Sequence, residues 1–291
     1  MLVDKGISYT RIEPIIKWPG GKRWLVKRFP GLFHIETESR YFEPFLGGAA
    51  AFVFYRPKNA HLSDINDELI RVYLAIKDDP DQVASMLFAH QKKHCKEYYY
   101  FIRNQNPSDM FETAARFMYL NRTCFNGIYR VNRHGQFNVP MGSRTELGIT
   151  TDDIQEWSHL FQTATISSCD FEEAIRKTVC GDFIFADPPY VINHNANGFL
   201  KYNEALFSWA DQKRLASVLC DAAERGVRIV VTNANHQSVS ELYPDIFCRA
   251  TIMRNSLVAG SASNRGKTEE LILWTKGALN EHVLRQGGVS G

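Results

Sequence analysis

The segment "FADPPYV", Phe185–Val191, joins an apolar run to an acid, two prolines and an aromatic ring. Prolines lack a backbone N–H and have a fixed φ, so Pro188 and Pro189 are expected to end a strand at this point. The segment is therefore either a strand-ending turn with a surface tyrosine or a rigid shelf that presents Asp187 and Tyr190 beyond a buried strand. The rest of the chain decides between these interpretations.

Patterns on both sides of this segment predict an α/β fold. The runs "RYFEPFLGG", "AHLSDI", "VRIVVTNAN" and "ELILWT" have the character of buried strands. The second run is followed by a helix whose apolar face comprises Leu69, Val72, Tyr73 and Ile76. A later helix has Ser208 and Asp211 as a capping pair and Gly226 at its end. Continuous apolar strands separated by helices are typical of a parallel sheet covered on both faces.

The middle of the chain differs from its two ends. Helical stretches are followed by "NGIYRVNRHGQFNVPMG", and the piece "RVNRHGQFNV" resembles a β-hairpin with Arg133, His134 and Gly135 at its turn. We therefore expect one sheet domain formed by residues 1–80 and 166–280, with an insertion at 81–165. Residues 281–291 are expected to form a disordered tail.

Composition sets limits on the class of protein. The chain has 291 residues and a net charge of +2, which does not by itself indicate a nucleic-acid partner but allows a local basic patch. No signal peptide or membrane-spanning run is visible, and the six cysteines are scattered, as in a reduced, cytoplasmic protein. His90, His94 and Cys95 have the spacing of metal ligands, but the polar run "HQKKHCKE" favours a solvated helix face. We predict no metal site.

Several polar or glycine-rich segments follow the predicted strands, where open parallel sheets bind ligands. Gly47 and Gly48 would let the backbone approach a ligand closely, or would form a tight turn. Asp64 would accept hydrogen bonds from ribose hydroxyls, or would cap the following helix. No Walker lysine follows the glycines, which favours a nucleoside cofactor over phosphate transfer. In "KWPGGK", Trp18 would pack against a flat ring and Lys22 would lie near a carboxylate, or the segment is a basic surface turn.

Taken in order, "KWPGGK", "FEPFLGG", "DIND", "FNGIYRVNRHGQFNVPMG" and "DPPY" resemble the motifs of Dam-type (alpha-class) DNA adenine-N6 methyltransferases. The resemblance covers roughly residues 15–275. It implies a Rossmann-like methyltransferase sheet with helices on both faces, plus an inserted, mostly helical target-recognition domain with a β-hairpin. It also implies S-adenosyl-L-methionine as cofactor and double-stranded DNA as partner. Ala49 departs from the family, where a second glycine of G-x-G is common, and Phe125 replaces a frequent tyrosine.

The resemblance assigns residues to three roles. The catalytic motif consists of Asp187, Pro188, Pro189 and Tyr190. The cofactor contacts are expected at Trp18, Lys22, Glu43, Pro44, Phe45, Gly47, Gly48, Asp64, Asp170, Phe171 and Asp187. The DNA contacts are expected at Lys17, Arg122, Phe125, Asn126, Ile128, Arg130, Arg133, Pro140 and Arg144. No metal ligand is implied.

The implied chemistry is physically consistent. The N6 atom of adenine cannot react inside the base stack, so the base must be flipped out. The ring of Tyr190 would stack on it, while the Asp187 carboxylate and the Pro188 carbonyl would accept the two N6 hydrogens. An arginine such as Arg130 suits bidentate contact with guanine O6 and N7, and Phe125 would wedge into the gap left by the base. The expected target sequence is GATC.

Other interpretations keep the fold and change the role. In these alternatives the methyl acceptor would be N4 of cytosine, an RNA adenine or a protein glutamine. By resemblance to the family, however, the acid of DPPY favours adenine in DNA. A non-catalytic DNA-binding regulator is a further alternative. We expect a monomer, because nothing in the sequence displays a dimer interface. A bacterial, phage or mobile-element origin and a cognate restriction endonuclease are compatible with the family.

Overall fold

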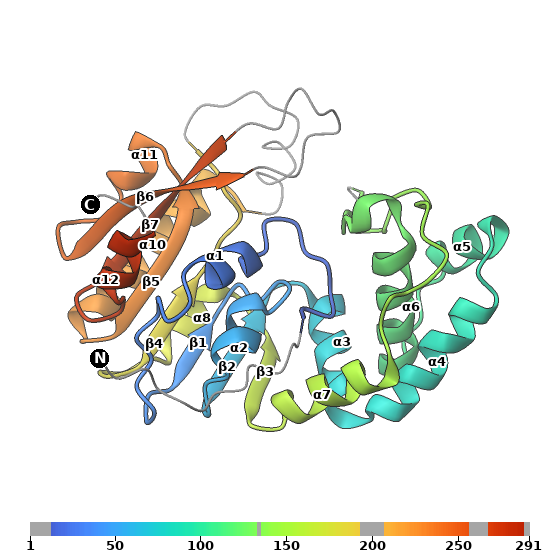
Figure 1. Ribbon diagram of the computed structural model, residues 1–291. Helices are drawn as coiled ribbons and strands as arrows, with labels where there is room; N and C mark the ends of the chain where they lie inside the picture. Colours follow the sequence, from blue (N-terminus) through green and yellow to red (C-terminus); the bar gives the residue numbers. More distant parts are fainter. Residues whose placement is uncertain (1–12, 133–134, 193–206, 256–266, 288–291) are drawn as a thin grey trace. The chain divides into compact units, whose positions relative to one another are not determined.

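The computed structural model describes residues 13–132, 135–192, 207–255 and 267–287 (Figure 1). The chain forms two compact units. The sheet unit comprises Trp24–Leu46, Pro57–Ile65 and the chain from Ala164 onward. The helical unit comprises the chain up to Arg23, Gly47–Arg56 and Asn66–Thr163.

The described residues of the sheet unit form a seven-stranded sheet in the order β3-β2-β1-β4-β5-β7-β6. The strands are β1 (Tyr41–Glu43), β2 (Ala60–Asp64), β3 (Ala164–Ser168), β4 (Phe183–Ala186), β5 (Arg228–Ala234), β6 (Phe247–Asn255) and β7 (Lys267–Thr275). The first five strands of this order pair in parallel, which confirms the predicted α/β fold. The strand β7 pairs antiparallel with β5 and β6, so the predicted parallel arrangement does not extend to the run "ELILWT".

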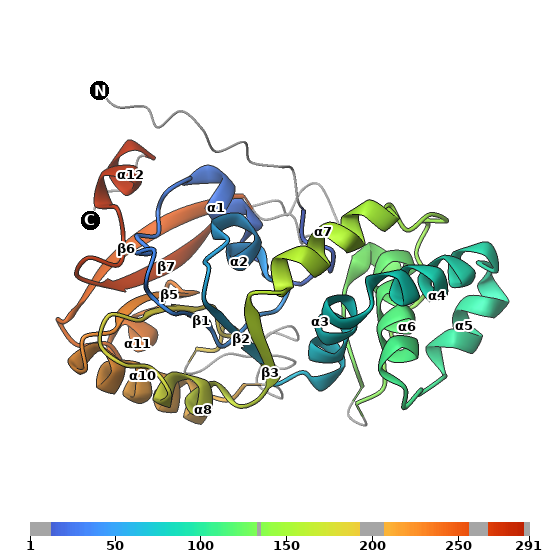
Figure 2. The same cartoon turned by 90° about the horizontal axis from the view of Figure 1, so that it is seen from below.

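Helices cover both faces of this sheet. They are α1 (Arg23–Arg28), α8 (Phe171–Arg176), α10 (Trp209–Glu224), α11 (Gln237–Ser240) and α12 (Glu281–Gln286). Figure 2 shows α8, α10 and α11 on one face and α1 and α12 on the other. The expectation of a disordered tail from residue 281 is wrong for α12, because Leu284 is buried and anchors that helix.

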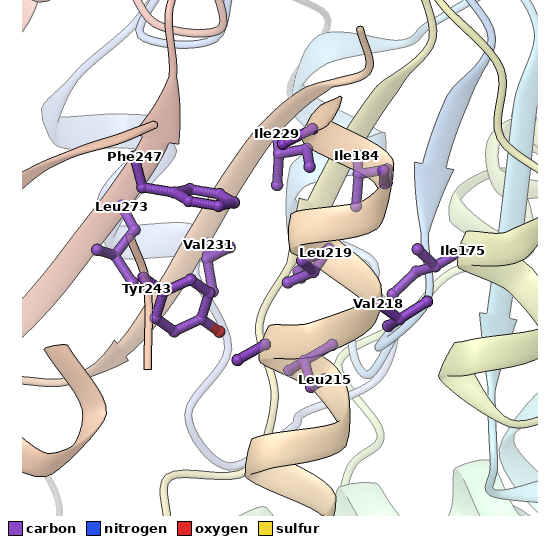
Figure 3. Packing of buried hydrophobic residues seen from close by; sticks show 14 of the residues in the cluster. Ile175, Ile184, Leu215, Val218, Leu219, Ile229, Val231, Tyr243, Phe247 and Leu273 are labelled. Carbon is purple, nitrogen blue, oxygen red and sulfur yellow. The ribbon is translucent and has the colours of Figure 1, made fainter. Parts of the chain in front are cut away.

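The helix α10 begins and ends where the sequence predicts. The Ser208 hydroxyl accepts from the backbone N–H of Asp211 at 3.2 Å, and the Asp211 carboxylate accepts from the Ser208 backbone N–H at 2.8 Å. Gly226, with φ of 86°, follows its last turn. Its apolar face packs against β4 and β5 (Figure 3). The residues of this core shown there include Leu215, Val218, Leu219, Ile184, Ile229 and Val231. This packing fixes the carboxyl ends of β4 and β5.

The helical unit is built around α6. Its elements are α2 (Ala50–Tyr55), α3 (Asp67–Asp78), α4 (Pro80–Lys92), α5 (Lys96–Arg103), α6 (Met110–Thr123), η1 (Phe125–Gly127) and α7 (Thr151–Phe161). Most of α6 is buried against α3, α4 and α5 (Figure 1). The predicted apolar face of α3 is buried at all four positions. Because α3 packs on α6 and α7, it belongs to this compact unit and not to the sheet unit.

The predicted hairpin is present as a short antiparallel pair. The backbone N–H of Asn132 donates to the carbonyl of Gln136 at 2.8 Å, and that of Asn138 donates to Arg130 at 3.2 Å. The expected turn residues Arg133 and His134 lie outside the described residues. Arg130 and Gln136 of this segment are exposed, as are Phe125 and Asn126 of the η1 turn before it, whereas Phe137 and Val139 are buried. The structure therefore confirms the hairpin, while its role in recognition stays a prediction.

Candidate functional site

The DPPY segment leaves the sheet at the end of β4, and two neighbouring strands hold its side chains. The Thr232 hydroxyl, on β5, donates to Oδ1 of Asp187 at 2.7 Å. The phenol of Tyr190 donates to Oε2 of Glu270, on β7, at 2.9 Å. Pro188, which lies between Asp187 and Tyr190 in the sequence, is buried. The structure therefore favours the rigid shelf over a surface turn.

Glu270 is a residue that the sequence analysis missed, together with its partner Arg254. Its side chain is 4% exposed, and Oε1 lies 2.7 Å from Nη1 of Arg254 on β6. Burial, with the carboxylates of Asp187 and Glu270 nearby, raises the pKa of Tyr190 well above its usual range. The phenol therefore stays protonated and acts as the donor. In the sequence, Glu270 lies in the predicted strand "ELILWT". It was missed because a carboxylate in a strand is normally expected on the face exposed to solvent.

Three carboxylates lie at or beyond the carboxyl ends of adjacent strands of the sheet unit. Glu43 ends β1, Asp64 ends β2 and Asp187 follows β4. Glu43 is 3% exposed and accepts from the Tyr41 hydroxyl at 2.7 Å. The buried Pro44 follows it. This end of the sheet is suited to a ligand with positive charge and hydroxyl groups.

The residues after Asp64 settle one alternative. Asn66 caps α3, because its Oδ1 accepts from the backbone N–H of Leu69 at 3.1 Å. Asp64 is therefore not the N-cap of α3, which was the alternative role considered for it. Ile65, the next residue along the chain, is 70% exposed, which is unusual for a large apolar side chain. An acid followed by an exposed apolar side chain offers both polar and apolar contacts, and the sequence analysis did not single out Ile65.

An aromatic cluster lies beside these strand ends. Phe171 stacks on Phe45 with ring centroids 5.4 Å apart, and both contact Phe207. The guanidinium of Arg214 lies 4.2 Å from the centroid of Phe171. Arg214 also binds both carboxylate oxygens of Asp170, at 2.7 and 2.9 Å. The predicted residues Phe45, Phe171 and Asp170 are therefore brought together.

Asp170 has clear structural partners. Its carboxylate caps α8 by accepting from the backbone N–H of Glu172 at 2.9 Å. The hydrogen bonds from Arg214 lower the pKa of this carboxyl below its usual range. Both oxygens thus serve the local fold, and the predicted contact of Asp170 with a cofactor stays a prediction.

In the helical unit, the loop before α1 packs on the glycine segment. A Cβ placed on Gly47 would lie 2.6 Å from Cδ1 of Trp18, and one on Gly48 would lie 3.2 Å from the Trp18 Cβ. The glycines were expected to let the backbone approach a ligand; in the structure it is Trp18 that approaches them. Ala49 has φ of 55°, in the left-handed region that favours glycine, at the position where the family often has one. Lys22 is 3% exposed, and its ammonium donates to the Gly20 carbonyl at 2.8 Å.

Lys17, the residue before Trp18, is held by α6. The amide side chain of Asn121 accepts from the Lys17 N–H at 2.9 Å and donates to its carbonyl at 2.8 Å. The lysine stem passes over Gly127, where a Cβ would lie 2.3 Å from its Cδ. Burial, followed by the charges of Arg144 and Arg122, lowers the pKa of Lys17 below its usual range. A group of like charges of this kind favours an anionic partner.

The structure leaves most predicted DNA contacts accessible. Phe125 is 53% exposed, an unusual value for a phenylalanine. Backbone bonds hold its turn, since the Phe125 N–H donates to the Pro140 carbonyl at 2.9 Å. Asn126 (with φ of 56°), Arg130, Pro140 and Arg144 are exposed, and Ile128 is half-buried. These side chains come from one turn and hairpin of the helical unit.

Of the predicted DNA contacts, Arg122 makes a different contact in the structure, and Arg133 cannot be placed. The guanidinium of Arg122 donates to the Ile15 carbonyl, with 3.0 Å from Nε to the oxygen. It therefore anchors the chain before Lys17, whereas the sequence analysis predicted a DNA contact for Arg122. Arg133 lies outside the described residues.

Comparison with known proteins decides the family. A profile of the D12 class N6 adenine-specific DNA methyltransferases matches residues 18–257. The chain belongs to this family.

Relatives in the family match almost end to end. A protein named Type II methyltransferase M1.LlaDCHI, of Lactococcus lactis, is 35% identical over 91% of this chain and 96% of its own length. A DNA adenine methylase of Haemophilus influenzae is 30% identical over 89% of this chain and 92% of its own. Another, of Vibrio cholerae, is 30% identical over 88% and 94%. The resemblance predicted from the motifs is thereby confirmed.

Two histidines of this D12-class chain, His90 and His94, pair with tyrosine hydroxyls. Nδ1 of His90 lies 2.8 Å from the Tyr98 hydroxyl, and Nδ1 of His94 lies 2.8 Å from the Tyr119 hydroxyl. Both rings are partly buried, so the expectation of a solvated face is wrong for them.

Among the described residues, no group of three or more metal-ligating side chains occurs. In the same part of the chain, no helix is long and apolar enough to cross a membrane.

Proposed function

We propose that the protein is a site-specific, adenine-specific DNA methyltransferase. It transfers a methyl group from S-adenosyl-L-methionine to N6 of an adenine flipped out of duplex DNA. The observation that carries this proposal is the DPPY segment, whose acid and ring are fixed by Thr232 and Glu270. The segment follows a buried strand in a chain of the D12 class.

The residues of the chain suit the cofactor. A sulfonium and an ammonium are cations, and three carboxylates, Glu43, Asp64 and Asp187, lie at or just beyond the ends of adjacent strands in the sheet unit. Asp64 would accept from the ribose hydroxyls, and the exposed Ile65 would contact the purine ring. The family resemblance implies further cofactor contacts at Trp18, Lys22, Pro44, Phe45, Gly47, Gly48, Asp170 and Phe171. When bound, the cofactor supplies an already activated methyl group.

The chain's own contribution is then positioning and hydrogen bonding. The Asp187 carboxylate and the Pro188 carbonyl accept the two hydrogens of the adenine N6 amine. This makes the amine more tetrahedral and directs its lone pair toward the methyl group. Thr232 holds Oδ1 of Asp187 at 2.7 Å, so the acceptor is oriented before the base arrives. The ring of Tyr190 stacks on the flipped base and keeps it in line.

Recognition of DNA is assigned to the helical unit. Exposed Arg130 would bind guanine O6 and N7, and Phe125 would fill the gap left by the flipped base. Lys17 would contact a base, and Arg144 a phosphate. The expected target is GATC, by resemblance to the Dam-type enzymes. The like charges around Lys17 support an anionic partner.

Other acceptors are weaker candidates. N4 of cytosine, an RNA adenine or a protein glutamine would use the same fold, but the chain belongs to a class defined by adenine N6 in DNA. A regulator that binds DNA without turnover would not require the oriented acid. We further propose a monomer acting in the cytoplasm of a bacterium or of a phage-infected cell. Type II names among the relatives favour a cognate restriction endonuclease as partner.

The experiment uses tritiated S-adenosyl-L-methionine with two duplexes, one containing GATC and one with that site scrambled. Label confined to the GATC duplex supports both the chemistry and the recognition sequence. Label on both duplexes keeps the chemistry and rejects GATC. Absence of label from any DNA rejects the methyltransferase proposal and directs the search to RNA and protein acceptors.

A further inference from the structure

The buried pair Glu270–Arg254 lies behind the DPPY tyrosine. Glu270 is on β7, where its backbone pairs with Ala234 of β5 and Ile252 of β6. Its side chain is 4% exposed and that of Arg254 is 20% exposed. A buried ion pair contributes little to stability on average, because desolvation offsets the attraction between the charges. The fold therefore does not require a carboxylate at this position, since an apolar side chain would serve a strand interior as well.

The contacts of Glu270 indicate another purpose. Oε1 receives Nη1 of Arg254 at 2.7 Å, and Oε2 receives the phenol of Tyr190 at 2.9 Å. Each oxygen thus has its own donor. Arg254 is itself backed by Trp24, whose ring centroid lies 5.9 Å from the guanidinium carbon. In its ion pair with Arg254, the Glu270 carboxylate offers two acceptor oxygens and no donor.

Tyr190 needs such an anchor. It follows Pro188 and Pro189, which have no N–H to donate to the sheet. A hydrogen bond from its hydroxyl to the Glu270 carboxylate on β7 fixes the far end of the ring instead. The three residues come from the loop after β4, from β7 and from β6.

We infer that Glu270, held by Arg254, is a positioning residue that fixes the plane of the Tyr190 ring for the flipped adenine. This inference rests on the proposed function, since it concerns the base that Tyr190 would hold. Glu270 acts through Tyr190 and does not itself contact the base. The sequence alone does not link Glu270 to Tyr190, because that link depends on β7 lying beside β5 in the sheet.

The experiment is a double-mutant cycle of Tyr190→Phe and Glu270→Gln, read by single-turnover methylation of the DNA duplex. Tyr190→Phe keeps the ring and removes the hydroxyl, while Glu270→Gln keeps the shape and removes the charge. We expect each change to slow methyl transfer by about 10- to 100-fold, the loss of one hydrogen bond to a charged group. The double variant is expected to be no slower than either single variant. Cofactor affinity should stay unchanged in all three.

The neighbouring acid supplies a matched control. Glu269 is exposed on the same strand and accepts from the Asn235 side chain at 2.7 Å, so Glu269→Gln should methylate at the wild-type rate. Slowing that multiplies in the double variant, or a wild-type rate for Tyr190→Phe, would overturn the inference. If Glu270→Gln does not fold, the Tyr190→Phe rate alone decides. A wild-type protein that methylates no duplex would overturn the proposed function, and the inference with it.

Discussion

The ring of Trp18 stacks on the ring of Tyr129, with centroids 5.3 Å apart and 20° between the ring planes. Tyr129 stacks in turn on Phe117 at 4.9 Å, and its hydroxyl donates to Oε2 of Glu68 at 3.1 Å. Trp18 belongs to the loop expected to meet the cofactor, and Tyr129 to the segment expected to meet DNA. Within the helical unit these two segments are therefore one packed element.

Removing the Tyr129 ring should destabilise this element far more than removing its hydroxyl. We expect Tyr129→Phe to lower the free energy of unfolding by about 1 kcal/mol, the usual contribution of a hydrogen bond. Tyr129→Ala should lower it by about 3 kcal/mol, because two stacked neighbours lose their contact. Urea denaturation measures both, with Tyr100→Phe as control. Equal stability of the Phe and Ala variants would contradict the account.

Gly127→Ala tests the seat of Lys17. The residue has φ of 64°, and an added Cβ would lie 2.3 Å from Cδ of Lys17. Gly148→Ala is the matched control, because its φ is 60° and, apart from the glycine and its two chain neighbours, no atom of the described chain lies within 4 Å of its added Cβ. Both changes should cost about 1–2 kcal/mol of backbone strain. Only Gly127→Ala should weaken DNA binding in fluorescence anisotropy, and equal binding by the two variants would reject Lys17 as a DNA contact.

The charge of Lys17 should make DNA binding depend on pH. Burial and the charges of Arg144 and Arg122 lower its pKa from the ordinary 10.5. As pH rises, Lys17 therefore loses its proton before an exposed lysine does, and affinity for DNA falls in a window below 10.5. Arg144→Ala removes one repulsion, so it should move this fall toward higher pH. A profile unchanged by Lys17→Met would show that another group titrates.

Phe125→Ala should separate stability from base flipping. The side chain is 53% exposed, so its removal should change the free energy of unfolding by less than about 0.5 kcal/mol. If Phe125 fills the gap in the duplex, its loss should slow methylation at the target adenine at least about tenfold, as for other stacking contacts to bases. Single-turnover rates on the GATC duplex measure this effect. A wild-type rate would remove Phe125 from the mechanism.

The sequence predicted those parts of the fold that depend on local patterns. The capping box of Ser208 and Asp211 and the stop at Gly226 lie where expected, because each is determined by a few adjacent residues. The strand β3, "ATISS", was missed because its residues are mostly polar or half-buried at the sheet edge. The antiparallel direction of β7 depends on long-range pairing, which a single apolar run does not encode.

The candidate site was predictable where motifs carry it and not where tertiary contacts do. Asp187 and Tyr190 could be chosen because prolines after an apolar strand are unusual. Glu270, Asn121 and Tyr129 were missed, since each acts on a residue far away in the chain. Asn121 lies on α6 and holds the backbone of Lys17, a contact that becomes visible only when the helix is packed.

The central claim is tested most directly by identifying the methylated nucleoside. Duplex DNA treated with the protein and S-adenosyl-L-methionine is digested and analysed by mass spectrometry, in parallel with Asp187→Ala. The account predicts N6-methyladenine from the wild type and its loss in the variant, because the variant lacks the proposed acceptor of an N6 hydrogen. N4-methylcytosine, or N6-methyladenine formed equally well by Asp187→Ala, would contradict it.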